Sequence, residues 1–300
     1  MVKFDRVKPR KHMLFVPADR PSLYRDSVFY KPDTIMFDLE DAVAYSEKDA
    51  ARMLLIEILN DIDYNASGIE TCVRINGLDT EFFEKDIEAC IKAKANMIRL
   101  PKAETVDDVN QLVALMEKYE KENNLDYKLK IFIAFESALG ILNAFEVAKA
   151  SDRIVGIALG GMDYLLDLKG SRLPNREELL YARQHLVHVG RALKLDVFDV
   201  VYGNTSDDQG FINEFKFIKS LGFDGKSVIH PNQIRLINEV YKPTQEQLEY
   251  ALEMKEAFEE SVKLGKGVFL FKGNMVDKPV VEKQLEIIEL AKEFDMEGAL

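Results

Sequence analysis

Eight short apolar runs constrain the fold of this chain more than any other feature of its sequence. Each has the length of a β-strand, and several are apolar at consecutive positions, which is typical of parallel strands that helices cover on both faces. The runs span residues 12–17, 34–40, 71–76, 97–102, 130–137, 154–161, 197–203 and 226–231.

Stretches with helical patterning separate these runs. Residues 47–62 and 81–95 repeat apolar side chains at intervals close to 3.6 residues and carry charges on the opposite face. Residues 105–123 begin with Thr105 as the expected N-cap, followed by two acids in the first turn, which the helix dipole favours. Eight strands alternating with helices predict an α/β fold, a (β/α)8 TIM barrel, and no glycine-rich fingerprint of a dinucleotide-binding sheet opens a helix.

The last part of the chain departs from this alternation. Residues 244–264 predict a helix that ends at Gly265, and residues 265–284 combine two glycine breaks with two short apolar pieces. This combination predicts a hairpin-like arm, followed by a final helix to about residue 294. We therefore expect a barrel domain at residues 1–243 and a C-terminal extension at residues 244–300.

Charge and composition narrow the class of protein. The formal net charge of −12 argues against nucleic acid or an anionic membrane as the main partner. The N-terminal apolar run is too short for a signal peptide, and no run approaches the length of a membrane span. Only Cys72 and Cys90 occur, which predicts reduced thiols that serve packing in a cytoplasmic protein.

Polar residues gather where the predicted strands end, the edge at which barrel enzymes place their active sites. Acids from three strands and cations from two would converge there. They are Glu40 and Asp41 after the second strand, Arg74 after the third, Lys102 after the fourth, Glu136 after the fifth and Asp163 after the sixth.

Several acids in one partly buried mouth must share protons or bind a hard cation. Oxygen ligands without cysteine or paired histidine favour Mg²⁺, with Mn²⁺ as an alternative, over zinc. Glu136 and Asp163 fit the one or two carboxylates that Mg²⁺ usually takes, because they end adjacent strands. Glu40 and Asp41 would then hold metal-bound waters.

Structural roles compete with these assignments. Asp41 could cap the next helix, Asp38 is expected to be a buried acid paired with a base, and Arg74 could form a structural salt bridge or position an anionic substrate. Lys102 could bind the substrate or act as the Schiff-base lysine of a metal-free aldolase. His185 and His188 lie three residues apart on a predicted helix, and without a third ligand we expect them on its surface.

The chain resembles the citrate lyase β subunits, within the HpcH/HpaI-type family of acyl-CoA lyases and aldolases. The resemblance covers nearly the whole length. Its motifs are MLFVP (13–17), MFDLEDAVA (36–44), EKDAAR (47–52), VRIN (73–76), RLPK (99–102), ESALGILNAFEVAKASDR (136–153), IALGGMDY (157–164), LGFDGKSVIHPNQI (221–234), VYKPT (240–244) and GNMVDKPVVEK (273–283).

The resemblance implies a role for each motif residue. Glu136 and Asp163 would bind Mg²⁺, with Glu40 and Asp41 supporting it through water. Arg74 and the backbone N–H groups at Gly160 and Gly161 would hold the carboxylate of the oxaloacetate portion. Asp277 would reach the active site of a neighbouring protomer as an acid/base group, which implies a homotrimer.

The chain also departs from the family pattern. Ala18 replaces a usual glycine, Lys11 and His12 stand in place of an Arg-Ser pair, Met162 replaces an acid, and His230 replaces an asparagine. Lys11 and the loop at Ala18 would border the channel for the carrier arm, so these changes bear on which carrier is used.

The implied activity is Mg²⁺-dependent cleavage of a citryl thioester, on coenzyme A or an acyl-carrier protein, to oxaloacetate and an acetyl thioester. The implied partners are the acyl-carrier and transferase subunits of citrate lyase. One alternative is a stand-alone lyase or condensing enzyme acting on malyl-CoA or citramalyl-CoA. Another is a homologue without activity that serves as a scaffold.

Overall fold

The computed structural model describes residues 10–265 and 267–298. The chain separates into two compact units, Met1–Arg235 and Leu236–Leu300, which are described in turn. The first nine residues of the expected barrel, Lys266 of the expected arm and the last two residues lie outside the described part.

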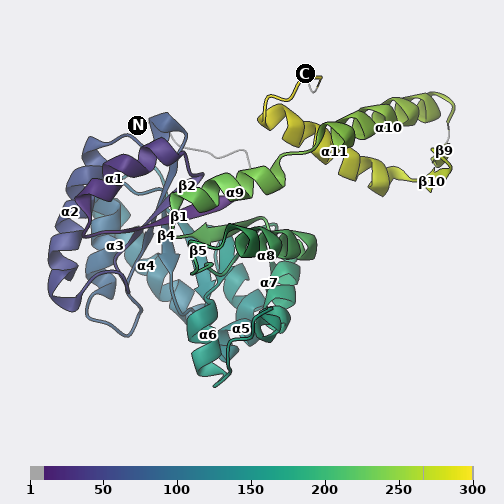
Figure 1. The fold of residues 1–300 in the computed structure, drawn as a ribbon. Helices are drawn as coiled ribbons and strands as arrows, with labels where there is room; N and C mark the ends of the chain where they lie inside the picture. The colour runs from purple at the N-terminus through teal and green to yellow at the C-terminus, as the bar shows by residue number, and fades with distance from the viewer. Residues whose placement is uncertain (1–9, 266, 299–300) are drawn as a thin grey trace. The chain divides into compact units, whose positions relative to one another are not determined.

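Eight parallel strands form a closed barrel in the described part of the first unit, which confirms the predicted (β/α)8 TIM barrel. Each strand pairs with the next, and β1 pairs with β8 to close the cylinder (Figure 1). The strands are β1 (His12–Pro17), β2 (Thr34–Asp38), β3 (Glu70–Arg74), β4 (Met97–Leu100), β5 (Lys130–Phe135), β6 (Ile154–Leu159), β7 (Asp196–Asp199) and β8 (Gly225–Val228).

Helices follow the strands and lie around the outside of the barrel (Figure 1). Thr105 caps the fourth helix as predicted, and the structure adds a capping box in which Asp108 bonds back to the cap backbone. The helices are α1 (Pro21–Ser27), α2 (Lys48–Asp61), α3 (Phe83–Lys92), α4 (Val106–Glu122), α5 (Ala138–Lys149), α6 (Gly161–Asp167), α7 (Leu180–Leu193), α8 (Asp208–Leu221) and α9 (Pro231–Tyr241). Short 3₁₀ turns are η1 (Val28–Tyr30), η2 (Tyr45–Glu47), η3 (Asn65–Ser67) and η4 (Glu177–Leu179).

Several predicted strands run past their true carboxyl ends. The seventh strand stops at Asp199 instead of residue 203, and the eighth stops at Val228 instead of residue 231. Pro231 starts α9, which suits a residue that has no N–H to donate and a φ already fixed near the helical value. The residues beyond each strand therefore become loops that surround the mouth of the barrel.

Apolar side chains fill the lower interior of the barrel. One layer has a side chain from seven of the eight strands: Met13, Met36, Cys72, Met97, Phe132, Ala158 and Phe198. At the amino ends of the strands, Arg10 pairs with Glu70 of β3 at 2.5 Å and with Asp196 of β7 at 2.6 Å. Because β1, β3 and β7 are not neighbours, these ion pairs span the floor and close this end of the barrel.

The second unit consists of two long helices and a hairpin. Helices α10 (Gln245–Lys263) and α11 (Lys278–Glu293) bury a shared apolar cluster around Leu248 and Ile288. Strands β9 (Phe269–Phe271) and β10 (Asn274–Val276) pair antiparallel, which confirms the predicted hairpin-like arm.

The buried thiols and the helices bear on two further expectations. Cys72 and Cys90 are free and buried, as expected for packing residues. Among the described residues, no helix combines the length and the apolar composition needed to cross a bilayer.

Candidate active site

A cavity of about 470 Å³ opens at the carboxyl ends of the barrel strands. Its walls combine acids, arginines and glycines from at least five strands with a few apolar side chains. The polar and glycine residues that line it are Asp38, Asp41, Arg74, Arg99, Glu136, Gly160, Gly161, Asp163 and Ser227.

Asp38, the last residue of β2, organises the loop that carries the next two acids. Its carboxylate accepts hydrogen bonds from the backbone N–H groups of Glu40 at 3.0 Å and Ala42 at 3.2 Å. It also receives two bonds from the guanidinium of Arg74, at 2.8 and 2.7 Å. Asp38 is therefore the expected buried acid paired with a base, and the base is Arg74.

Arg74 lies among three carboxylates, those of Asp38, Glu40 and Asp41. Its Nε and Nη2 hold Asp38 in a bidentate pair, and its Nη1 lies 2.9 Å from Glu40 and 3.3 Å from Asp41. Three of the five guanidinium N–H groups form hydrogen bonds with Asp38 and Asp41, and Glu40 is held by an ion pair. The same residue thus forms a structural salt bridge and lines the cavity.

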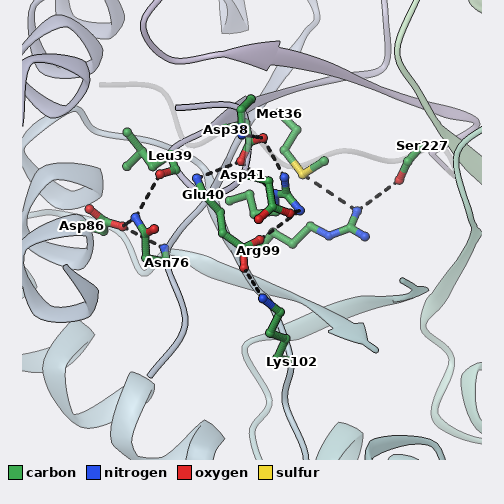
Figure 2. Close-up of polar contacts among 12 residues, drawn as sticks. Met36, Asp38, Leu39, Glu40, Asp41, Asn76, Asp86, Arg99, Lys102 and Ser227 are labelled. Carbon is green, nitrogen blue, oxygen red and sulfur yellow. Dashed lines mark hydrogen bonds and ion pairs between the residues drawn. The ribbon is translucent and has the colours of Figure 1, made fainter. Parts of the chain in front are cut away.

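Glu40 connects Arg74 to the next strand. Its second oxygen accepts a hydrogen bond from the Lys102 ammonium at 3.0 Å (Figure 2). Burial raises the pKa of Glu40, and the charges of Arg74 and Lys102 act in the opposite direction. The backbone of Lys102 has a φ of +51°, a left-handed conformation that directs the chain away directly after β4.

Asp41 does not cap a helix. The following helix begins at Lys48, its N-cap residue is Glu47, and no side chain caps it. The side chain of Asp41 is 63% exposed at the mouth, where its contact is the ion pair with Arg74. The capping interpretation was wrong because residues 42–44 and the 3₁₀ turn η2 separate Asp41 from that helix, and no side chain caps η2 either.

Glu136 follows β5 and is 5% exposed, beside Asp163 in the first turn of α6. Burial raises the pKa of Glu136 to about 8, helped by the charge of Glu40 and a hydrogen bond with Asp163. Gly160 makes this packing possible, because a Cβ at that position would lie 2.4 Å from the Glu136 Cγ. The sequence therefore places a buried carboxyl group, that of Glu136, beside a partly exposed one, that of Asp163, in the wall of the cavity.

These two acids fit a divalent cation. The Oε2 atom of Glu136 is buried and has no hydrogen-bond partner among the described residues, which is costly unless a ligand satisfies it. No group of three or more His, Cys, Asp or Glu side chains in the described part of the chain is arranged to hold a metal. A site of two carboxylates completed by water and substrate is the arrangement that Mg²⁺ prefers.

The backbone at the start of α6 differs from expectation. The N–H of Gly160 donates to the carbonyl of Phe135 at 2.9 Å, so it is not free to hold a substrate carboxylate. Gly160 belongs to the β5–β6 pairing instead. Gly161 lines the cavity, and a Cβ there would lie 2.5 Å from the Val200 Cγ1.

Lys11 lies at the wrong end of the barrel for substrate binding. It directly precedes β1, its N–H bonds to the carboxylate of Asp33 just before β2, and its carbonyl accepts from Lys226 of β8. The expectation that it borders the channel was wrong, because a residue before a barrel strand lies opposite the active-site face. Ala18, which follows β1, does lie at the mouth end, fully buried under the hydroxyl of Tyr24.

The structure adds Arg99, a cavity residue that the sequence analysis did not select. Arg99 lies on β4 with its side chain inside the barrel, 4% exposed, above the layer of Met13 and Met36. The signal was present in the sequence, since MIRLP places a charged residue on the same strand face as a buried methionine. The sequence analysis also did not select Ser227 of β8, whose hydroxyl accepts a hydrogen bond from Arg99.

The two predicted histidines lie on α7, outside this cavity. His188 is exposed on α7 and contacts the carbonyl of Gln184, which confirms the expected helix-surface position. His185 stacks on Tyr181 but is partly buried, and its buried Nε2 has no hydrogen-bond partner among the described residues, so the surface expectation was only partly right for it. Asp277 belongs to the second unit, where its carboxylate accepts from the N–H of Val280 and caps α11. It is exposed at the base of the hairpin.

Comparison with known proteins gives concordant matches. The model of the HpcH/HpaI aldolase/citrate lyase family matches residues 11–231. The chain is 46% identical to citrate lyase subunit beta of Leuconostoc mesenteroides subsp. cremoris, over 94% of this chain and 93% of that protein. It is 32% identical to the mitochondrial citramalyl-CoA lyase of Rattus norvegicus, over 94% of this chain and 86% of that protein.

A solved structure agrees over the same extent. The crystal structure of CitE from Mycobacterium tuberculosis in complex with magnesium, acetoacetate and coenzyme A superposes with a TM-score of 0.80. The two chains are 29% identical, and the match covers 95% of this chain and 98% of CitE.

Proposed function

We propose, from the premise that the chain belongs to the HpcH/HpaI aldolase/citrate lyase family and is a carbon–carbon lyase, that it cleaves a citryl thioester. The products would be oxaloacetate and an acetyl thioester, and the chain would be the β subunit of citrate lyase. The observation that carries this proposal is the buried Glu136 carboxylate, whose Oε2 has no partner among the described residues, beside Asp163 in a cavity with two arginines.

Glu136 and Asp163 would hold Mg²⁺, or Mn²⁺ in its place. When bound, the ion would supply Lewis-acid chemistry that acidifies the tertiary hydroxyl of the citryl group. Glu40 and Asp41 would support it through water, since both lie on the loop beside Arg74. That CitE is described in complex with magnesium supports this assignment.

Arg74 would position the substrate carboxylate beside the acids. Its guanidinium is held rigidly by Asp38, so little side-chain entropy remains to be lost when substrate binds. Lys102 would contribute a second positive charge at the rim, where its side chain is 49% exposed. Together they would orient the anionic substrate for cleavage.

Cleavage requires two proton movements. The hydroxyl proton leaves to a base as the carbon–carbon bond breaks and the keto group of oxaloacetate forms. The electron pair of that bond remains on the carbon α to the thioester carbonyl, as an enolate. This α carbon must gain a proton to give the acetyl thioester. We assign that proton transfer to Asp277 of a neighbouring protomer in a homotrimer, with residues 244–300 as the extension that supplies it.

A mixing experiment tests the shared site. Chains with Asp277→Ala and chains with Arg74→Ala should each be inactive alone and should recover part of the activity when refolded together. Recovery is expected because one protomer of the mixture keeps an intact cavity and its neighbour keeps Asp277. A mixture that stays inactive while forming trimers would contradict this role of Asp277.

The function itself is tested with the purified chain and defined thioesters. Citryl-CoA should be cleaved to oxaloacetate in the presence of Mg²⁺, and EDTA should abolish the reaction. Acyl-carrier and transferase subunits would supply citryl groups in a citrate lyase complex, and they should co-purify with the chain. Absence of citryl-CoA cleavage at saturating Mg²⁺ would overturn the proposal.

A second candidate is lyase or condensing activity on malyl-CoA or citramalyl-CoA, which the match to the rat citramalyl-CoA lyase favours. Assays with the three thioesters side by side separate the two activities. A scaffold without activity is the remaining alternative. Calorimetric absence of Mg²⁺ binding would favour it.

A further inference from the structure

Arg99 occupies the floor of the cavity, where the charge of the Glu136 carboxylate acts on it. Its Nη1 donates to the Ser227 hydroxyl at 3.1 Å and faces the sulfur atom of Met36 at 3.8 Å (Figure 2). The sulfur atom of Met13 lies 3.9 Å from the same nitrogen. The rings of Phe15 and Phe132 lie 5.8 and 5.9 Å from its guanidinium carbon. Within the described residues, no carboxylate forms an ion pair with it.

A count of donors separates Arg99 from Arg74. A guanidinium has five N–H groups. Three of those on Arg74 form hydrogen bonds with Asp38 and Asp41. By contrast, the Nε of Arg99 is buried without a partner, and its Nη2 makes no hydrogen bond with any described residue. Arg99 therefore keeps three donors on the edge formed by Nε and Nη2, and this edge matches the two oxygens of a carboxylate.

An unpaired buried arginine is costly, because the protein interior replaces water poorly around a charge. Other buried arginines of this chain avoid that cost. Arg183 pairs with Asp199 at 2.8 Å, and Arg153 pairs with Glu120 at 2.6 Å. Among the described residues, no acid bonds directly to Arg99 and Glu136 acts on it by charge alone, which indicates that a ligand entering the cavity supplies the bonded counter-ion.

We propose that Arg99, assisted by Ser227, binds the distal carboxylate of the citryl group and thereby sets the substrate specificity. This inference rests on the proposed function. A citryl group carries one carboxylate on the carbon that bears the hydroxyl and a second one on a methylene attached to that carbon. Malyl and citramalyl groups carry only the first. Arg74 and the acids would hold the first carboxylate, and the second would reach down to the floor.

Two substrates that differ only in the distal carboxylate test the assignment. In Arg99→Met, kcat/KM for citryl-CoA should fall by about 100-fold, because a buried polar site is left without its partner. Citramalyl-CoA should be cleaved by the variant within about threefold of its rate with the unaltered chain, because this substrate makes no contact that depends on Arg99. Methionine matches the neighbouring side chains, so it should fill the space that arginine leaves.

Product binding gives a readout independent of catalysis. In calorimetry with Mg²⁺, Arg99→Met should weaken oxaloacetate binding by about 10-fold to 100-fold and leave pyruvate binding unchanged, because one charge-assisted bidentate contact is lost. Ser227→Ala should weaken oxaloacetate in the same direction by less. Arg99→Lys should fall between the unaltered chain and Arg99→Met, since it keeps the charge and loses the fork.

The outcomes separate the two proposals. If Arg99→Met loses citryl-CoA and citramalyl-CoA cleavage equally, or neither, the specificity role is overturned. If Arg99→Met does not fold, an unchanged ratio of oxaloacetate to pyruvate affinity in both Arg99→Lys and Ser227→Ala overturns it. If the unaltered chain cleaves no citryl thioester, the proposed function fails, and the paired binding measurements still decide whether Arg99 selects the distal carboxylate.

Discussion

The barrel contains two buried groups of charged side chains that differ in how completely they are paired. The first, here called the wall cluster, lies between β7, β8 and the helices outside them and consists of Arg183, Asp199, Glu214 and Lys226. Asp199 receives two bonds from Arg183, at 2.8 and 2.9 Å, and one from Lys226 at 2.6 Å. Lys226 also pairs with Glu214 at 2.5 Å. No polar atom of these four described side chains is buried without a partner.

The second group, here called the mouth cluster, lies at the cavity and consists of Arg74, Arg99, Glu136 and Asp163, which line it, and Glu40, which pairs with Arg74. Here Glu40 Oε2, Arg99 Nε and Glu136 Oε2 are buried without hydrogen-bond partners among the described residues. Burial lowers the pKa of Arg99 and raises that of Glu136, so each would be more stable with a charged ligand beside it. The difference shows that complete pairing accompanies a structural role, whereas unmet donors and acceptors mark a place prepared for ligands.

The largest expected effect comes from the mouth cluster. Glu136→Gln should lower Mg²⁺-dependent kcat/KM by about 1,000-fold or more, because the Lewis-acid contribution is worth several kcal/mol. The urea unfolding free energy of the metal-free protein should not fall, since the folded state already disfavours the charged form of this side chain.

The matched control is Glu117→Gln on α4, whose side chain is 59% exposed and should leave activity unchanged. A large loss of stability in Glu136→Gln would place Glu136 with the structural pairs and remove the contrast between the clusters.

The wall cluster should show the opposite behaviour. Asp199→Asn should destabilise the protein by about 3–5 kcal/mol, because it leaves Arg183 and Lys226 buried with an incomplete counter-charge. Urea unfolding measures this loss, and kcat per folded molecule should stay the same. Asp208→Asn is the control, since its pair with Arg235 is exposed and should change stability by less than about 0.5 kcal/mol.

Acidity should sharpen the contrast. Burial alone would raise the pKa of Asp199. The charges of Lys226 and Arg183 outweigh burial and hold this pKa below its ordinary value of 3.8. The unfolded chain therefore takes up this proton at a higher pH than the folded chain does. The stability that Asp199 contributes is complete above its unfolded pKa and is lost as the pH falls through its folded pKa.

The expected slope from this one group is at most about 1.4 kcal/mol per pH unit. Unfolding titrations of the unaltered chain and Asp199→Asn from neutral pH into the acid range should differ by this slope. Parallel curves would show that Asp199 does not titrate differently in the two states.

The smallest effect is expected at the rim of the mouth cluster. Lys102→Gln removes a half-exposed ion pair with Glu40, which should change stability by about 0.2–1 kcal/mol. Mg²⁺-dependent cleavage should persist within about tenfold, because Lys102 contributes charge and no covalent chemistry. Complete loss of activity, together with borohydride trapping of substrate on the unaltered chain, would support a Schiff-base lysine instead.

The eight strands, the hairpin arm and the acids at the mouth could be predicted because each depends on local pattern and on the rule that barrel active sites lie at the carboxyl ends of strands. The same rule, applied to Lys11, would have placed it correctly. Lys11 precedes its strand and therefore lies at the end of the barrel opposite the mouth, and the prediction that it borders the substrate channel overlooked this. The Gly160 N–H was assigned to substrate because its bond to Phe135 depends on the register of β5 and β6.

Arg99 illustrates the remaining limit. A strand pattern shows that its side chain shares a face with Met97, but both faces of a barrel strand are buried. Which face meets the cavity, and whether an acid from another strand reaches the guanidinium, follow from contacts across the cylinder. Its partner Ser227 lies 128 residues further along the chain.

The ion pairs of Arg10 with Glu70 and Asp196 and the apolar layer above them leave the barrel closed at its amino end. Reactant and both products must then use the same passage. If the keto acid forms at the depth of Arg99 and the thioester occupies the passage above it, the thioester has to depart first. Steady-state kinetics should therefore report ordered release, with oxaloacetate as the second product to leave.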